Sequence, residues 1–113
     1  MTISYFVFYQ GKSEDQERFL EHYKNVHVPI LYRFPGIKRV SMHSPTEGID
    51  PENTQTGGFA LLAQLVFEDQ KSLNEALQSE ERILARQDML ENFPHFTGNI
   101  MHQAMQTDRI NNE

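Results

Sequence analysis

The segment Phe59-Ala-Leu-Leu-Ala-Gln-Leu-Val-Phe67 sets the architecture of this 113-residue chain. It has the length of a strand and is apolar almost throughout, and the pair Gly57-Gly58 precedes it, so it predicts a buried β-strand. Alternate residues of a strand point to opposite faces of a sheet. Both faces are apolar here: one has Phe59, Leu61, Ala63, Leu65 and Phe67, and the other has Ala60, Leu62 and Val66 with Gln64. The strand therefore predicts a sheet that needs cover on both sides.

Three more segments have the composition of strands, at residues 3–9, 37–44 and 97–106. One helix is predicted between the first two strands, and another begins at Asp69 or Ser72, after the third strand. The order strand-helix-strand-strand-helix-strand is typical of a ferredoxin-like α+β domain, in which two helices cover one face of an antiparallel sheet. An α+β sandwich with a different strand order is the alternative.

Local features refine the ends of these elements. Ser13 and Gln16 have the spacing of a capping box, which predicts the start of the first helix. Pro29 has no backbone N–H, so it should kink or end that helix. Residues 87–93 are interpreted as a short extra helical turn, and residues 107–113 as a polar, frayed tail. The inward stripe of the second helix is predicted to consist of Leu73, Ala76, Leu77 and Leu84.

The composition excludes several classes of function. The chain has 10 Lys and Arg against 16 Asp and Glu, a formal net charge of −6, so its surface repels nucleic acid. It has no Cys, which excludes disulfides, iron–sulfur clusters and thiolate nucleophiles and suits a reducing cytoplasm. No apolar run approaches the roughly 20 residues of a membrane span, and the N-terminus lacks the basic region of a signal peptide. We therefore expect one cytoplasmic domain over residues 1–113, with no membrane or nucleic-acid partner.

The sequence also lacks the motifs of three common kinds of site. Gly57-Gly58 has no helix start behind it, so it does not form a phosphate-binding loop, and no Gly-x-Ser-x-Gly nucleophile elbow occurs. No His-x-x-x-His or Glu-x-x-His pair occurs either, so a metal site is not expected. These absences argue against phosphoryl transfer, dinucleotide binding, serine hydrolysis and metal chemistry, and no cofactor is predicted.

The uncovered face of the sheet predicts a homodimer. Residues 3–9 repeat the pattern of the central strand: Phe6 and Phe8 take one face, while Tyr5 and Tyr9 take the other. Two strands that are apolar on both faces leave a large contiguous patch, which usually marks an interface or a ligand site. A second copy packed sheet to sheet would cover this patch and enclose a cavity between sheet and partner. The alternative is that these side chains are tolerated at the surface.

His27 is the first candidate for chemistry. At about 100° per residue it lies near the middle of the apolar arc of the first helix, and His22 lies at the edge of that arc. Tyr23 is four residues before His27, so the two side chains are neighbours on the helix surface. A buried imidazole without a hydrogen-bond partner costs about 1–3 kcal/mol, and its ordinary pKa is near neutrality. Two interpretations follow: a structural histidine bonded to a backbone carbonyl, or a functional group that lines a cleft.

The segment His22-Tyr-Lys-Asn-Val-His27-Val-Pro-Ile-Leu31, followed by Phe34-Pro-Gly-Ile37, resembles the signature of the EthD family, which belongs to the dimeric α+β barrel superfamily. The typical pattern is an aromatic residue, a spacer, His-x-Pro-Leu, and then Pro-Gly. The matching positions are Tyr23, His27, Pro29, Ile30 and Pro35-Gly36, with Ile30 in place of the usual Leu. The resemblance implies a ferredoxin-like protomer that pairs through its sheet into a barrel-like dimer. It also favours a position for His27 on the wall of a cleft.

Families of this architecture include cofactor-free monooxygenases, lactone isomerases, decarboxylases, dehydratases and haem-associated enzymes. The leading hypothesis is therefore a cofactor-independent oxidoreductase, lyase or isomerase that acts on a small, largely apolar organic molecule. In this hypothesis His27 moves the proton, and Tyr23 or Tyr5 orients the substrate or the histidine. The alternative is a non-catalytic dimer that binds a small molecule or haem.

Further residues could complete the site. Tyr5, His43 and Ile30 are the candidate substrate-binding residues. His43 and His102, both on predicted strands, could join His27 across a cavity, although each could equally be an ordinary strand histidine. Tyr5 and Tyr9 suit a cavity wall, because the ring packs while the hydroxyl group finds a partner, but plain packing explains them as well.

Overall fold

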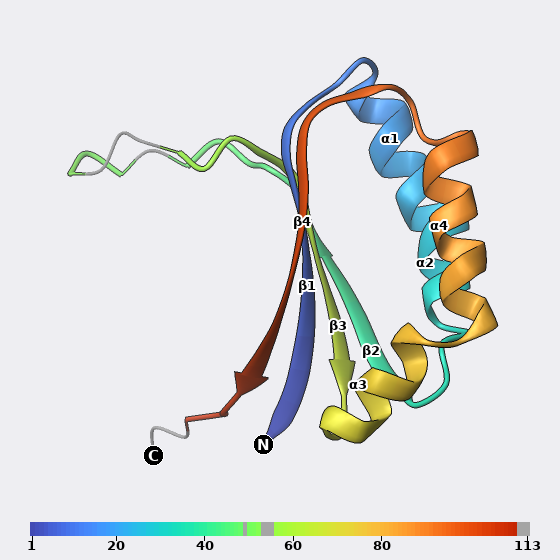
Figure 1. The fold of residues 1–113 in the computed structure, drawn as a ribbon. Coiled ribbons are helices and arrows are strands. Elements are labelled where there is room, and N and C mark those ends of the chain that lie inside the picture. The colour runs from blue at the N-terminus through green and yellow to red at the C-terminus, as the bar shows by residue number, and fades with distance from the viewer. Residues whose placement is uncertain (49, 53–55, 111–113) are drawn as a thin grey trace.

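The computed structural model describes residues 1–48, 50–52 and 56–110, which form one antiparallel sheet with the helices on one face (Figure 1). The elements in chain order are β1 (Thr2–Ser13), α1 (Gln16–His22), the π-helical segment η1 (Tyr23–His27), α2 (Val28–Leu31), β2 (Ile37–His43), β3 (Phe59–Phe67), α3 (Gln70–Leu77), α4 (Glu80–Asn92) and β4 (Phe96–Thr107). The strand order is β2-β3-β1-β4, and all neighbouring strands are antiparallel. The predicted ferredoxin-like βαββαβ fold is confirmed.

The first helix begins later than the capping-box spacing predicts. Its N-cap is Asp15, whose carboxylate accepts the backbone N–H of Arg18 at 3.0 Å. Ser13 is still part of β1, because β1 pairs with β4 as far as Phe96. The side chain of Gln16 donates instead to the carbonyl of Ala60 at 2.9 Å. The predicted capping box is therefore wrong, and an aspartate cap replaces it.

The second predicted helix is in fact two helices, α3 and α4. Asp69 caps α3, as predicted, but a break follows, and the hydroxyl group of Ser79 caps α4 by accepting the N–H of Arg82 at 3.3 Å. The break resets the helical phase, so Leu84, predicted to face inward, is 39% exposed. Residues 87–93 are not an extra turn, since α4 runs through them to Asn92. Of the predicted tail, the first residue belongs to β4, and residues 111–113 lie outside the described part of the chain.

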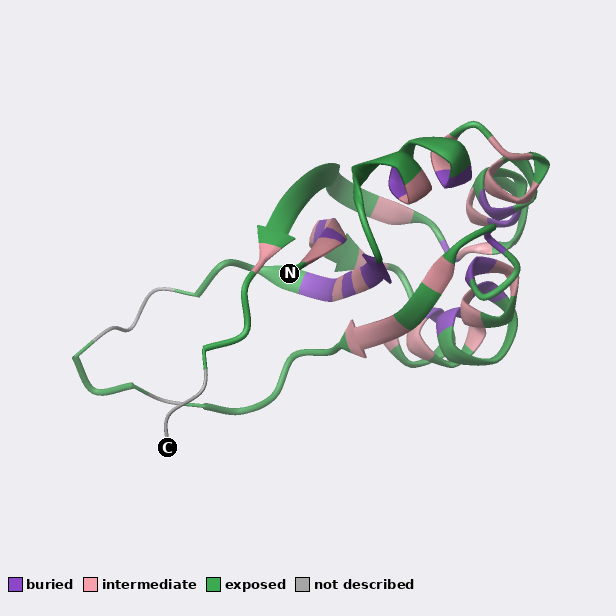
Figure 2. Ribbon diagram, turned by 90° about the horizontal axis from the view of Figure 1, so that it is seen from below, coloured by how far each residue is buried: buried purple, intermediate pink, exposed green. Residues whose placement is uncertain are grey.

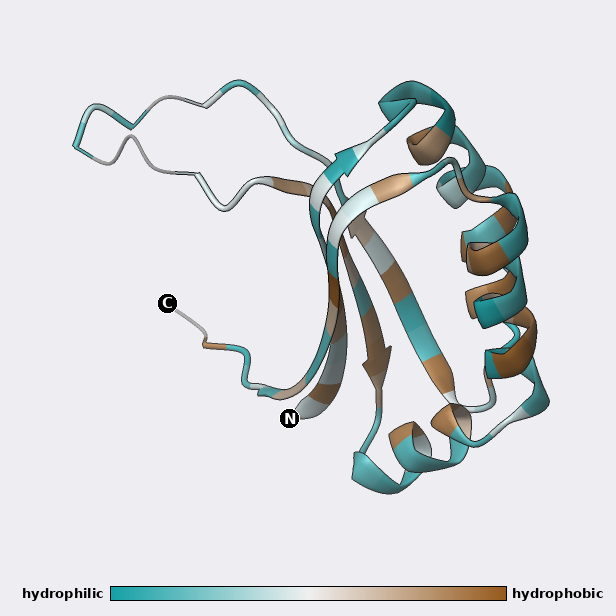
Figure 3. Ribbon diagram, turned by 45° about the horizontal axis from the view of Figure 1, so that its top comes forward, coloured by the Kyte–Doolittle hydropathy of each residue, from teal (hydrophilic) through white to brown (hydrophobic). Residues whose placement is uncertain are grey.

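The sheet has an inner face under the helices and an outer face without them. Inner-face residues of β1 and β3 pair across the strands, as Tyr5 with Leu65, Val7 with Ala63 and Tyr9 with Leu61. Figure 2 shows that buried residues gather on these inner strands and on the helix sides toward the sheet. Figure 3 shows the matching pattern of hydropathy, with apolar residues on the helix sides that face the sheet and polar residues turned outward. The hydrophobic core therefore lies between helices and sheet.

The outer face keeps the second set of apolar side chains. Its main members are Phe6, Phe8, Leu62, Met101 and Met105. The ring of Phe59 joins them, with its centroid 5.8 Å from that of Phe8, although the strand pattern predicts it on the inner face with Leu61. The cause is an irregularity in the pairing: Tyr9 and Gln10 of β1 pair with Leu61 and Phe59, so Ala60 of β3 has no partner and Phe59 takes the outer face. Among the described residues, every helix is too short or too polar to cross a bilayer.

β1 and β4 approach very closely at a cross-strand glycine pair, Gly11 and Gly98. Both have a positive φ, of 137° and 146°. A Cβ atom on Gly11 would lie 2.1 Å from the carbonyl oxygen of Thr97, and one on Gly98 would lie 2.0 Å from that of Gln10. Only glycine therefore fits at either position.

We expect Gly11→Ala to destabilise the protein by about 1–3 kcal/mol, because the backbone must leave its conformation to relieve the contact. Gly48→Ala is the matched control, since a Cβ atom there meets nothing within 4 Å and the backbone has no positive φ. Urea denaturation followed by circular dichroism measures both variants. Equal unfolding midpoints for the two variants would contradict the prediction.

Candidate functional site

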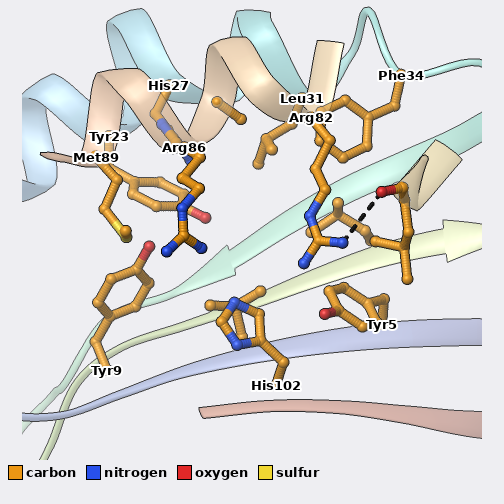
Figure 4. Close-up of a pocket in the computed structure, with 14 residues that line it drawn as sticks. Tyr5, Tyr9, Tyr23, His27, Leu31, Phe34, Arg82, Arg86, Met89 and His102 are labelled. Atoms are coloured by element: carbon orange, nitrogen blue, oxygen red, sulfur yellow. Dashed lines mark hydrogen bonds between the residues drawn. The ribbon is translucent and has the colours of Figure 1, made fainter. Parts of the chain in front are cut away.

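A cavity of about 80 Å³ lies inside one chain, between the inner face of the sheet and the helices (Figure 4). The sequence predicts a cavity between the sheet and a partner, whereas this cavity lies on the other side of the sheet, under the chain's own helices. The helices do not lie flat on the sheet, because bulky side chains such as Tyr23, Phe34 and Met89 hold the two layers apart along the cavity. A cavity of this size holds several times the volume that one bound water needs.

His27 reaches the cavity from a widened helical turn. In η1 the N–H of Val28 bonds to the carbonyl of Tyr23, five residues earlier, and Pro29 follows with no N–H of its own. Tyr23 and His27 are both buried, and their ring centroids are 4.8 Å apart. The helical spacing of this pair, predicted from the sequence, thus corresponds to a close contact at the cavity wall.

Asp88 of α4 is the partner of His27. Nδ1 of His27 donates to Oδ2 of Asp88 at 2.8 Å, and the carboxylate is 5% exposed. The other carboxylate oxygen, Oδ1, accepts from Nδ2 of Asn92 at 2.9 Å and from Nε2 of His22 at 2.9 Å. Because Nδ1 carries the proton toward Asp88, Nε2 of His27 has a free lone pair on the cavity side. His27 is therefore bonded to a carboxylate, in place of the backbone carbonyl that the structural interpretation assumed.

The protonation states of this pair follow from its surroundings. Burial lowers the pKa of His27, and the hydrogen bond and charge of Asp88 oppose that shift without cancelling it. Burial would raise the pKa of Asp88, but hydrogen bonds from Asn92, His27 and His22 outweigh it and hold this pKa below its ordinary value. At neutral pH the pair is a neutral imidazole beside an ionised carboxylate, which is the arrangement of a general base and the group that orients it.

Acid should destabilise the protein in two stages. Folded His27 has a pKa below the ordinary value of 6.5, so the unfolded chain binds the proton first. Its contribution to stability is complete above pH 6.5 and is lost as the pH falls from there through the folded pKa. The contribution of Asp88 to stability is complete above pH 3.8, its ordinary pKa. It is lost as the pH falls from there through the depressed pKa of the folded state. Unfolding midpoints in urea at a series of pH values test this prediction, and a rise in stability below pH 6 would contradict it.

The cavity also contains the hydroxyl groups of three tyrosines. Burial raises the pKa of Tyr5, Tyr9 and Tyr23, so all three keep their protons and can donate hydrogen bonds at neutral pH. The rings of Tyr9 and Tyr23 meet edge to face with centroids 5.9 Å apart. Tyr5 lies against His102 of β4, with a centroid distance of 5.7 Å. The cavity thus combines the imidazole of His27 with several neutral donors.

Two arginines of α4, which the sequence reasoning missed, line the same cavity. Arg82 donates from Nη1 to the carbonyl of Leu77 at 3.1 Å, and Arg86 extends into the cavity beside Tyr9 and Tyr23 (Figure 4). Asp88 was missed as well. In sequence it is separated by 61 residues from His27, and no motif links the two. One signal was present, since a charged residue three positions after the inward-facing Ala85 falls on the same side of the helix.

The structure brings together some of the candidate residues and separates others. His27, Tyr23, Tyr5 and Tyr9 line the cavity, and so does His102. His43 does not, because it is exposed and pairs with Leu62 on the outer face. Ile30 packs against the core without reaching the cavity. No cluster of three or more potential metal ligands occurs within the described residues.

Comparisons with known proteins agree with this architecture. An EthD family protein from Bacillus halodurans is 20% identical, with a TM-score of 0.75, and the match covers 96% of this chain and 100% of that one. A monooxygenase from Streptomyces coelicolor, solved with nanaomycin D, is 13% identical, with a TM-score of 0.67 and coverage of 99% and 92%. A cofactor-independent oxygenase from Streptomyces nogalater is 11% identical, with a TM-score of 0.63 and coverage of 96% and 95%.

A further structure similar to this chain is described as a dimeric ferredoxin-like protein of unknown function, from Thermobifida fusca. It is 7% identical, with a TM-score of 0.65 and coverage of 95% and 92%. Among curated proteins, no match to the chain was found. Identities this low show a shared fold and nothing more. The EthD domain, however, matches residues 12–96, which is most of the sequence, and the chain belongs to the EthD family.

Proposed function

We propose that this protein is a cofactor-independent enzyme that removes a proton from a small, largely apolar organic molecule. The observation that carries the proposal is the His27–Asp88 pair, in which a carboxylate at 2.8 Å holds Nδ1 and leaves Nε2 toward the cavity. The apolar walls support an apolar substrate, and buried Leu31 and Leu65 are part of them. The shared fold of the two Streptomyces oxygenases is consistent with this class of chemistry.

In the proposed reaction Nε2 of His27 takes a proton from the substrate, and the negative charge of Asp88 stabilises the imidazolium that forms. The substrate becomes an anion, and the hydroxyl groups of Tyr23 and Tyr5 donate hydrogen bonds to the oxygen on which its charge develops. In an isomerisation the proton returns to another atom of the same molecule.

Deuterium exchange tests the proton transfer without a known product. Ketones, lactones and phenols are incubated in D2O with the protein, and NMR reports loss of the proton next to the carbonyl group or on the ring. The proposal expects exchange in at least one compound with the wild-type protein. A full panel without enzyme-dependent exchange would overturn it. A Soret band on addition of haem that is lost in His27→Gln would favour haem binding instead. Parallel aerobic and anaerobic incubations separate an oxygenase from an isomerase.

The proposed assembly is a homodimer formed through the outer face of the sheet. Phe6, Phe8, Leu62, Met101 and Met105 would be covered by the same residues of a second copy. Similar structures from Thermobifida fusca and Bacteroides fragilis are described as dimeric, which supports the proposal. This face lies opposite the cavity, so each copy would keep its own site.

We expect sedimentation to find dimers at micromolar concentration and to find monomers for Leu62→Glu, because two buried carboxylates would oppose each other across the interface. The control is Leu90→Glu on the exposed side of α4, which should remain dimeric. Wild-type monomers at this concentration would contradict the proposed dimer.

A further inference from the structure

Arg82 and Arg86 occupy neighbouring turns of α4 and extend from it into the cavity (Figure 4). Residues four apart lie on the same side of a helix, so the two positive charges face the same space. His102 lies across that space on β4, and its ring is between the two guanidinium groups in the close-up. Burial lowers the pKa of His102, and the charges of Arg82 and Arg86 lower it further, so both charges act on this part of the cavity.

Neither arginine has a carboxylate within 4.0 Å among the described residues. Arg18 of α1, which does not line the cavity, contacts Glu14 at 3.6 Å and Asp15 at 3.8 Å. The single hydrogen bond of Arg82, to the carbonyl of Leu77, leaves most of its donors free. Two like charges on neighbouring turns repel each other, and a bound anion would relieve that repulsion.

We propose that Arg82 and Arg86 form an anion-binding subsite and that the ligand of this cavity is a monocarboxylate with an apolar body. The planar guanidinium group matches a carboxylate in geometry, with two parallel hydrogen bonds. Leu31, Phe34 and Leu65, all buried, line the cavity beside this subsite and fit an apolar ring or chain. This inference rests on the proposed function in one respect, since it takes the same cavity as the substrate site. It adds that the substrate carries a negative charge.

Ligand binding tests the subsite directly. A series of aromatic and alicyclic monocarboxylates of increasing size, each paired with its uncharged primary amide, is titrated by ligand-observed NMR. At least one carboxylate should bind about 10- to 100-fold more tightly than its amide, since hydrogen bonds to charged groups are worth more than neutral ones. Arg86→Gln and Arg82→Gln should each remove most of that preference. Arg86→Lys, which keeps the positive charge, should retain part of it. Arg18→Gln is the matched control and should keep the preference in full.

A second readout needs no ligand. In Arg86→Gln the pKa of His102, followed by NMR of its ring protons, should rise because one repelling charge is gone. An unchanged pKa of His102 in both arginine variants would overturn the shared subsite. So would a series in which no carboxylate binds better than its amide, or a preference that survives both glutamine substitutions.

The two proposals fail separately. His27→Gln lacks the base but keeps both arginines, so it should keep the preference for a carboxylate over its amide while losing deuterium exchange. Wild-type exchange in neutral compounds, with no preference for any carboxylate, would remove the anion subsite and leave the proton-transfer enzyme intact. Preferential carboxylate binding without exchange in any compound would remove the proton-transfer enzyme and leave the anion subsite intact.

Discussion

Replacing His27 with glutamine is expected to lower turnover by at least about 100-fold while the chain stays folded. Glutamine can still hydrogen-bond to Asp88, but its amide does not take up a proton near neutral pH. The loss is therefore a loss of the base, with the packing around it largely preserved. The measurement is the rate of deuterium exchange per mole of protein, with circular dichroism and thermal unfolding as the test of folding.

Two further variants define this prediction. Asp88→Asn should also lose most of the activity, because it removes the charge that stabilises the imidazolium, and it should lower the pKa of His27 further. His95→Gln is the control, since that side chain is exposed and outside the cavity. Turnover of His27→Gln equal to that of the control would remove His27 from the mechanism.

The substitution Phe19→Ala is expected to cost about 3–5 kcal/mol of unfolding free energy. Phe19 is 1% exposed, and its ring centroid lies 5.3 Å from that of Tyr9, 5.5 Å from that of Phe93 and 6.1 Å from that of Phe96. Removing the ring leaves a cavity where α1 meets the sheet. A domain of this size has about 5–15 kcal/mol of stability in total, so the substitution removes a large share of it.

Urea denaturation measures this loss, and Leu90→Ala is its matched control. Leu90 is 67% exposed on α4, so its truncation should change the stability by less than about 0.5 kcal/mol. A loss below about 1 kcal/mol for Phe19→Ala would mean that the aromatic cluster closes over the missing ring. The same cluster supports the site, because the ring of Phe93 packs on His27 with centroids 4.9 Å apart.

Much of the local structure was predictable. The strand predicted over residues 59–67 coincides with β3, and the βαββαβ order is confirmed, although each predicted helix is divided into shorter segments. These predictions succeeded because strand alternation and helical periodicity depend on residues close together in the chain. The proximity of Tyr23 and His27 was predictable for the same reason, as both belong to one helical segment.

Other features were predicted wrongly or missed. His43 was a candidate to join His27 across a cavity, but the alternation of β2 directs Val40 and Met42 to the inner face and leaves His43 on the outer one. The face on which His43 lies depends on the register of β2 against β3, which includes an irregularity after Ile37. The cavity under the chain's own helices was not foreseen, because no local pattern shows how far the helices stand from the sheet.

Short-range sequence patterns determine three features of this protein. They are the fold class, the apolar character of both sheet faces and the helical pairing of Tyr23 with His27. The site depends on distant segments that meet only in the folded protein. A new cap at Ser79 resets the phase of α4, and packing then brings this helix against η1. Arg82 and Arg86 thereby reach the cavity, and Asp88 reaches His27. A periodic pattern specifies which side of a helix or strand is buried. Which residues of another element contact that side depends on the packing of the whole domain.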